Sequence, residues 1–150
     1  MAIIEKKLEE MGVQLKELAP SIYPILRTRQ SGNMLYVSGH PSDILGKLGA
    51  DLTVAEGYQG ARQAAINCLS AAKGAIGDLD KIKQFVKLLG MVNCTPDFID
   101  QPYVINGATD LLTEAFGKDV GAHARSAVGM VSLPRGIAVE LEIIIYLKEE

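Results

Sequence analysis

Apolar side chains at helical spacing predict three helices. The first covers residues 3–11, where isoleucine, leucine and methionine side chains share one face, and Gly12 follows as a stop. The second begins after Thr53, which forms a capping-box pattern with Glu56, and runs to about Ile76. Its inner face is made mostly of small residues, so this helix can lie close against a sheet: Val54, Tyr58, Ala61, Ala65, Cys68, Ala72 and Ile76.

Residues Thr95 to Pro102 form a turn and the start of the third helix, which continues to about Phe116, just before Gly117. Its inward side chains are again apolar at helical spacing: Val104, Ala108, Leu111, Leu112 and Ala115. This helix and the second one therefore each present one continuous apolar face.

Runs of β-branched and other apolar residues predict strands between and after the helices. They cover residues 33–39, 82–92, 124–133 and 137–147. Residues 13–31 read as a loop that leads into an extended segment, and residues 40–51 as a second loop. Only the short turn Leu133–Gly136 separates the last two runs, so we expect them to pair as an antiparallel hairpin.

The interleaved helices and strands indicate an α+β fold, a mixed sheet with two helices packed on one face. We expect one domain over residues 1–150, in which residues 1–12 form an extra N-terminal helix. The last strand alternates aliphatic side chains on one face with Ala138, Glu140, Glu142, Ile144 and Tyr146 on the other. This second face is too apolar to be left in water, so we expect another copy of the chain to cover it.

Composition excludes several classes of protein. Hydrophobic residues make up 48% of the 150 residues, which rules out a disordered chain, and no apolar run reaches the roughly 18 residues of a membrane span. The net charge of −3 argues against a nucleic-acid partner, since such binders are usually basic. Two cysteines and an N-terminus without a long apolar stretch predict a cytoplasmic protein. His40 and His123 lie far apart and no CxxC or HExxH motif occurs, so we expect no metal site.

Arg125 and two glutamates stand out because they interrupt apolar strands. Arg125 lies in AHARSAVGM, and Glu140 and Glu142 lie in AVELEIII. A buried guanidinium cannot lose its proton, so it needs a carboxylate partner. That partner is either a glutamate, in a structural ion pair within or between chains, or a ligand carboxylate held by two parallel hydrogen bonds. In the expected hairpin Arg125 faces Ile144 and Glu140 faces Gly129, so the two charges need not pair directly and could meet across a subunit boundary.

Three stretches resemble one protein family. His123–Glu142 (HARSAVGMVSLPRGIAVELE) is similar to the C-terminal signature of the YjgF/Rid family, the reactive-intermediate (enamine/imine) deaminases, also labelled endoribonuclease L-PSP. Gly32–Gly39 (GNMLYVSG) resembles the family's strand that ends in Ser-Gly, and residues 55–75, with the run NCLSAA, resemble a helix of the family. The motifs occur in the same order and cover nearly the whole chain from Gly32 onward. The extra N-terminal helix resembles a longer branch of the family.

The resemblance implies a chorismate-mutase-like fold and a barrel-like homotrimer with three clefts between subunits. It implies cofactor-free hydrolysis of enamines and imines, of the 2-iminobutanoate and 2-iminopropanoate type, to 2-keto acids and ammonia. In that scheme Arg125 clamps the substrate carboxylate, and Glu140 positions or activates the attacking water. Ser38 and Gly39 line the cleft, and Asn106 lies near the position of a family asparagine.

The sequence also departs from the family pattern around these residues. Ala127 stands where the family has a cleft cysteine, His123 replaces the usual proline, and His40 replaces a common glutamine. The family's cleft tyrosine has no match at the right offset, since Tyr23 lies two residues too far from Gly32. Because the arginine and the glutamate are kept while the residues around them differ, these departures concern the identity of the substrate more than the type of reaction.

Other functions are left open by the sequence. A protein that binds small carboxylates such as 2-keto acids without turnover would use the same arginine, whereas only a catalyst needs Glu140. An endoribonuclease or translation inhibitor is a further alternative, although the acidic balance of charge counts against it. A trimeric scaffold is compatible with the composition as well.

Overall fold

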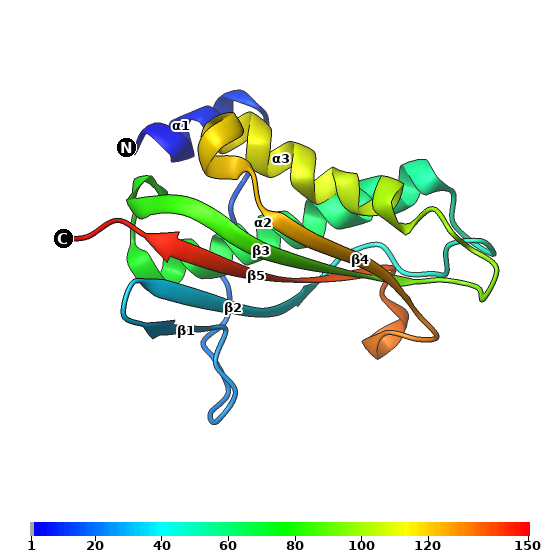
Figure 1. Ribbon diagram of the computed structural model, residues 1–150. Coiled ribbons are helices and arrows are strands. Elements are labelled where there is room, and N and C mark those ends of the chain that lie inside the picture. The colour runs from blue at the N-terminus through cyan, green and yellow to red at the C-terminus, as the bar shows by residue number, and fades with distance from the viewer. Residues whose placement is uncertain (1) are drawn as a thin grey trace.

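A mixed five-stranded sheet forms the centre of the computed structural model, which describes residues 2–150 (Figure 1). The strands are β1 (Thr28–Ser31), β2 (Met34–Pro41), β3 (Ile82–Asn93), β4 (Ala124–Met130) and β5 (Val139–Leu147). Their order across the sheet is β1-β2-β5-β3-β4. All neighbours run antiparallel except β3 and β4, which are parallel. The α+β class expected from the sequence is confirmed.

Three α-helices accompany the sheet within the described residues: α1 (Ile3–Glu10), α2 (Val54–Ile76) and α3 (Gln101–Gly121). The ends of α2 confirm the capping prediction, because the Thr53 hydroxyl accepts from the Glu56 backbone N–H at 3.2 Å and Gly77 ends the helix in the left-handed region. In α3 the backbone leaves helical geometry at Gly117, where the sequence predicts the end, and one further turn follows. Two short turns, η1 (Leu79–Lys81) and η2 (Pro134–Gly136), complete the secondary structure of this region.

The expected hairpin of the last two strands is wrong, because β3 lies between β4 and β5. The connection through α3 is long enough to return the chain parallel to β3, so β4 takes the edge of the sheet. Residues 131–138 then pass over the end of β3 and carry the chain to the sheet centre, where β5 finds a partner on each side. Arg125 is consequently paired with Leu88, and Glu140 with Met91, rather than with Ile144 and Gly129.

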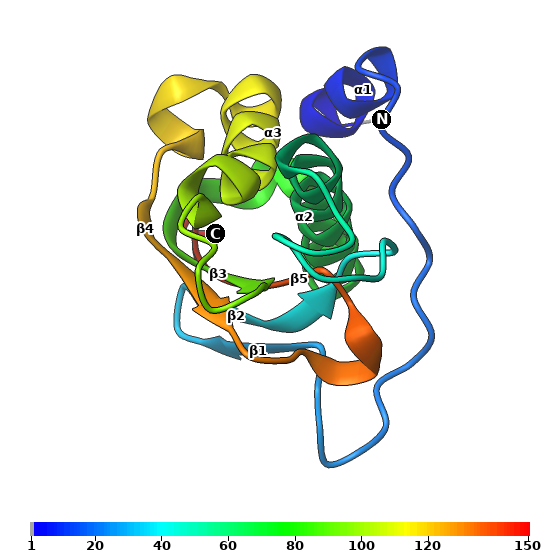
Figure 2. The same cartoon turned by 90° about the vertical axis from the view of Figure 1, so that its right-hand side faces the viewer.

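The two faces of the sheet differ in what covers them. Both long helices pack on one face, while the opposite face carries no helix in the part of the chain described (Figure 2). Alternate residues of β5 are buried beneath the helices, and Leu141 and Ile143 are at most 1% exposed. On the uncovered face, Tyr36 is 46% and Val128 37% exposed. The predicted division of β5 into a core face and a partly apolar open face is confirmed.

Helices α2 and α3 approach so closely at Gly107 that no side chain fits there. A Cβ at this position would overlap the carbonyl oxygen of Tyr58 and lie 3.2 Å from the Arg62 nitrogen, both backbone atoms of α2. The Gly107→Ala variant should therefore lower the free energy of unfolding by about 1–3 kcal/mol, measured by urea denaturation. Gly74→Ala is the matched control. Its Cβ would meet nothing within 4 Å on the surface of α2, so it should raise stability by about 0.5–1 kcal/mol. Equal effects of the two variants would contradict this close packing.

Neither α2 nor α3 has the character of a transmembrane helix. In residues 2–150 no helix combines the length and the apolar character that spanning a membrane requires.

Candidate functional site

Arg125 lies on the helix-covered face of the sheet and is held by α3. One nitrogen of its guanidinium, Nη1, donates to Asn106 Oδ1 at 2.8 Å and to Thr109 Oγ1 at 3.1 Å. Strand β4 supplies the arginine, while Asn106 and Thr109 lie one turn apart on the helix that precedes it. The structure thus brings together Arg125 and Asn106, two of the residues expected in the site.

No carboxylate of residues 2–150 lies within ion-pair distance of the Arg125 guanidinium. Residues 2–150 contain three ion pairs by distance, and none of them involves Arg125. Asn106 and Thr109 offer neutral oxygen atoms, so the positive charge is oriented but not compensated. An intrachain ion pair with Glu140 or Glu142, one of the alternatives left open by the sequence, is therefore wrong, while a neighbouring chain or a ligand is compatible with this geometry.

Ala127 follows two residues after Arg125 and shares its face of β4. It pairs with Gly90 of β3 and packs partly buried against the core. The position that holds a cysteine in the family pattern thus carries a methyl group here, on the same face as the guanidinium. No thiol is available at this point of the strand.

Glu140 lies on the uncovered face of the sheet, beside Gly39. A Cβ at Gly39 would lie 2.5 Å from Glu140 Oε2, so the glutamate side chain runs directly over the glycine backbone. Here the pairing of β2 with β5 shifts between Val37 and His40, and this irregularity contains Ser38 and Gly39. The Ser38 hydroxyl donates to the carbonyl of Leu26 at 2.5 Å, which ties the strand to the preceding loop. Ser38, Gly39 and Glu140 therefore lie together at the irregular part of the pairing between β2 and β5.

Burial raises the pKa of the Glu140 carboxyl, and the negative charge of Glu142 raises it further. Both effects disfavour the charged form, so the side chain binds a proton more readily than an ordinary glutamate. A carboxylate of this kind is a stronger base, which suits a group that accepts a proton from water.

The arginine group and the glutamate group lie apart within one chain. Arg125 points toward α3, whereas Glu140 alternates with Val139 and Leu141, which are buried under the helices, and so points to the opposite face. The register places them two strands and three residues apart, about 14 Å between backbone positions. One chain therefore holds two half-sites on opposite faces of its sheet.

Tyr23 and His40 lie next to the glutamate half-site. A cavity of about 530 Å³ is bounded by the loop that contains Tyr23 and by Ser38, Gly39 and His40. Tyr23 is 87% exposed, so its ring is available to a ligand or to another subunit. His40 is buried, its Nδ1 lies 2.6 Å from the carbonyl oxygen of Ser38, and burial lowers its pKa. Sequence reasoning found no place for Tyr23, because the path of the loop decides it.

Sequence reasoning also missed Thr109 and the contacts of His123. The His123 Nε2 atom lies 3.1 Å from Thr109 Oγ1, and its Nδ1 lies 2.7 Å from the carbonyl oxygen of Gly121. The spacing of Thr109 from Asn106, one helical turn, is the signal that could have indicated a shared partner.

Comparison with known proteins agrees with the fold and the motifs. The family model described as "YjgF/chorismate_mutase-like, putative endoribonuclease" matches residues 5–147. Protein TCP17 of Trypanosoma cruzi is 41% identical over 150 residues, covering 96% of this chain and 94% of that protein. The chain belongs to the YjgF family.

Two solved structures of high similarity share the chorismate-mutase-like fold of the family. Protein Atu1372 of Agrobacterium tumefaciens, described as having unknown function, is 38% identical with a TM-score of 0.89, covering 97% of this chain and 94% of that one. A "putative endoribonuclease" of Shewanella oneidensis is 32% identical with a TM-score of 0.90, covering 96% and 99%. Both cover nearly the whole of this YjgF-family chain, the N-terminal region included.

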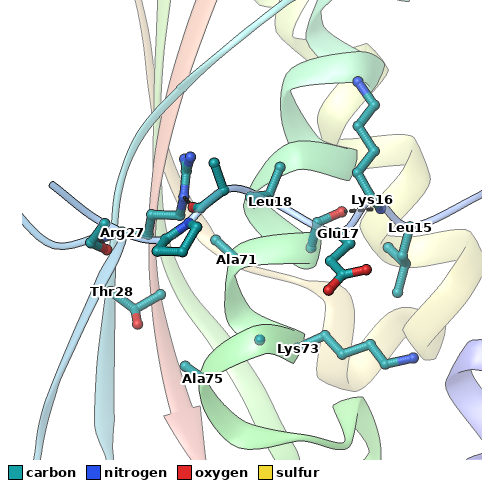
Figure 3. A pocket seen from close by; sticks show the side chains of 14 residues that line it. Leu15, Lys16, Glu17, Leu18, Arg27, Thr28, Ala71, Lys73 and Ala75 are labelled. Carbon is teal, nitrogen blue, oxygen red and sulfur yellow. Dashed lines mark hydrogen bonds between the residues drawn. The ribbon is translucent and has the colours of Figure 1, made fainter.

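A second cavity, of about 630 Å³, contains none of the expected site residues (Figure 3). It lies between the segment of residues 15–21 and the C-terminal half of α2. The backbone N–H of Lys16 donates to Ser70 Oγ at 2.9 Å, and the Lys16 ammonium pairs with Asp43 at 3.0 Å. These contacts attach the long N-terminal connection of this YjgF-family protein to the domain.

Among residues 2–150, one cluster of carboxylates, beside the start of α1, has oxygen atoms close enough together to hold a metal ion. Oxygen atoms of Glu5, Asp78 and Asp80 lie within 4.8 Å of one another. The Asp80 carboxylate accepts from the backbone N–H groups of Ile3 and Ile4, both at 2.8 Å. This negative group at the helix N-terminus anchors α1, which is a sufficient structural role for the cluster.

The contact between Gly39 and Glu140 can be tested directly. Gly39→Ala places a methyl group where Glu140 Oε2 lies, and the flexible carboxylate has to move away. If Glu140 acts in imine hydrolysis, as the resemblance of the sequence implies, kcat/KM for an imine substrate should fall by about 10–100-fold, because misplacing a reacting group by an ångström is costly to catalysis. The free energy of unfolding should change by less than about 1 kcal/mol. Gly74→Ala, the same chemical change at an open position, should leave kcat/KM unaltered; an unimpaired Gly39→Ala enzyme would show that this approach is irrelevant to activity.

Proposed function

We propose that this protein is a cofactor-free deaminase that hydrolyses 2-imino acids, formed from reactive enamines, to 2-keto acids and ammonia. The observation that carries the proposal is the guanidinium of Arg125, which two neutral side chains orient and which no carboxylate in the described part of the chain compensates. Such a group is a receptor for a carboxylate, which every 2-imino acid carries. Family membership supports the same reading.

The reaction follows from the two half-sites. Arg125 holds the substrate carboxylate and so fixes the imine carbon in place. Glu140 takes a proton from water while the water oxygen bonds to the carbon of the protonated imine, whose carbon–nitrogen π pair moves to nitrogen, and the product is a neutral carbinolamine. Glu140 returns its proton to the amino group. The carbon–nitrogen bond then breaks as Glu140 takes the hydroxyl proton and the carbonyl forms, so the keto acid and ammonia leave and the proton is released to solvent. General base catalysis of this kind contributes typically about 10²–10⁴-fold.

The catalytic cleft of this proposal lies between subunits of a homotrimer. Because Arg125 and Glu140 lie on opposite faces of one sheet, a substrate touching both needs the arginine of one subunit and the glutamate of its neighbour. The uncovered face supports such an assembly, since its exposed Tyr36 and Val128 are apolar groups suited to burial against another copy. A closed symmetric ring repeats the same cleft at each boundary.

A competition assay tests the proposal. An amino-acid oxidase or a serine/threonine dehydratase generates the imino acid in solution, and semicarbazide traps it as a semicarbazone. The protein should divert the imine to the free keto acid and lower the yield of semicarbazone. If the yield is unchanged with several side chains on the imino acid, the deaminase proposal is wrong.

Two alternatives give different outcomes. A protein that binds small carboxylates without turnover would shift its melting temperature with 2-keto acids yet leave the trap unaffected, and replacing Glu140 would not alter that binding. An endoribonuclease, the description of the Shewanella relative, would cleave RNA. The net charge of −3 does not favour such a substrate.

A further inference from the structure

The hydrogen bonds of Arg125 leave one edge of its guanidinium free. Nη1 bears two N–H groups, and Asn106 and Thr109 accept one each, at 2.8 and 3.1 Å. The N–H groups of Nε and Nη2 have no partner among residues 2–150. These two groups point the same way along one edge of the planar fork, which matches the two oxygens of a carboxylate.

The direction of each hydrogen bond behind Arg125 follows from donor chemistry. Arginine can only donate, so Thr109 Oγ1 accepts from Nη1 and its own proton is free to go elsewhere. The nearest acceptor given by the geometry is His123 Nε2 at 3.1 Å, which must then carry a lone pair. The imidazole proton therefore resides on Nδ1, which donates to the carbonyl oxygen of Gly121 at 2.7 Å. The network assigns this tautomer without conflict at any atom.

We propose that Thr109 and His123 are positioning residues for substrate recognition. His123, fixed by the Gly121 carbonyl, orients the Thr109 hydroxyl, and Thr109 together with Asn106 holds Arg125 so that its Nε–Nη2 edge receives the substrate carboxylate. The site thereby selects substrates with a free carboxylate over the corresponding uncharged amides. This inference rests on the proposed function, because it requires Arg125 to bind a carboxylate.

The test compares Thr109→Val, which removes the hydroxyl at similar shape, with Thr109→Ser, which retains it. For a 2-imino acid, Thr109→Val should raise KM about tenfold with kcat changed less than about twofold, because a hydrogen bond to a charged group is lost from binding. Thr109→Ser should stay within about threefold of the wild-type KM. The KM for the matching 2-imino amide should be the same in all three proteins. A merely structural defect would affect both substrates alike.

The same comparison is made for His123. His123→Gln retains an acceptor near the Nε2 position and His123→Phe does not, so only the phenylalanine variant should raise KM for the acid. Long-range ¹⁵N–¹H NMR of the free protein should show the Nδ1–H tautomer of His123. The opposite tautomer, or equal KM values in Thr109→Val and wild type, overturns the inference.

Calorimetry with 2-oxobutanoate, the keto-acid product, separates this inference from the deaminase proposal. Binding that weakens about tenfold in Thr109→Val without any turnover in wild type supports the positioning role and rejects the deaminase. If the Thr109→Val variant turns over the substrate and binds the keto acid as well as wild type does, only the positioning role is rejected. Absence of both turnover and binding in wild type rejects both.

Discussion

Replacing Glu140 with glutamine should lower kcat for imine hydrolysis by about 10²–10⁴-fold, the usual contribution of a general base. Glutamine preserves the size of the side chain beside Gly39 but cannot accept a proton from water. Substrate binding should be retained, because the carboxylate is held by Arg125 from the other half-site. The measurements are kcat and KM in the semicarbazide competition assay, together with calorimetric binding of the keto acid.

Glu142→Gln is the matched control for this variant. Glu142 lies two residues along β5 on the same uncovered face, so the substitution makes the same chemical change nearby without touching the proposed base. Its kcat should stay within about threefold of wild type. An equal loss in both variants would show that the charge of this face matters, and not the basicity of Glu140.

The pH dependence of the reaction should report the raised pKa of Glu140. The ionised form is the active base, so the rate falls as the pH drops through the pKa and the carboxylate is protonated. Because burial and Glu142 raise that pKa, the fall should begin at a higher pH than for an ordinary glutamate. Removing the Glu142 charge lowers the pKa, so the acid limb of kcat/KM should move to lower pH in Glu142→Gln. An unmoved or oppositely displaced limb would exclude Glu140 as the titrating group.

Local patterns allowed both ends of α2 to be predicted, and those of α1 to within a residue, whereas α3 runs one turn beyond its predicted end and the order of the strands could not be predicted. The capping of α2 depends on Thr53 and Glu56, which are three residues apart, and Gly77 ends the helix through its own backbone. The position of β5 depends instead on burial of apolar surface. One face of this strand is fully apolar, and the strand buries most of that surface at the centre of the sheet, where it lies. The short connection between β4 and β5 favoured a hairpin, but burial of β5 at the centre of the sheet stabilises the observed strand order instead.

The candidate site shows the same division between local and tertiary information. Arg125 and Glu140 could be selected because charged residues interrupt apolar strands, whereas Ser38 and Gly39 were indicated only by the resemblance of their strand to the family's motif. The spacing of Thr109 from Asn106 indicates that the two share one face of α3, but their contact with Arg125, and that of Thr109 with His123, depend on how α3 lies over β4. That Arg125 and Glu140 lie on opposite faces also emerged only with the register, since the expected hairpin placed them differently.

Mixing two inactive variants should restore activity if each cleft is shared between subunits. An Arg125→Ala subunit keeps its glutamate, and a Glu140→Gln subunit keeps its arginine. In trimers assembled at random from equal amounts, about a quarter of the boundaries join an intact Arg125 to an intact Glu140, so about a quarter of the wild-type activity should return. The two proteins are unfolded together and refolded. If they are instead produced together with different tags and purified through both, only mixed trimers remain, in which one boundary of the three is intact, so about a third of the wild-type activity should return.

Geometry makes this outcome a strict test, because the alternative predicts no recovery at all. If Arg125 and Glu140 of the same subunit acted on one substrate, every subunit in the mixture would lack one of them, and the mixed trimers would be as inactive as their parents. Mixing folded variants without refolding controls for subunit exchange and should restore nothing. Two half-sites on opposite faces of one sheet, about 14 Å apart along it, can act on a small molecule only when a second copy brings the missing half. Recovery near a quarter would therefore establish both the assembly and the division of labour between its subunits.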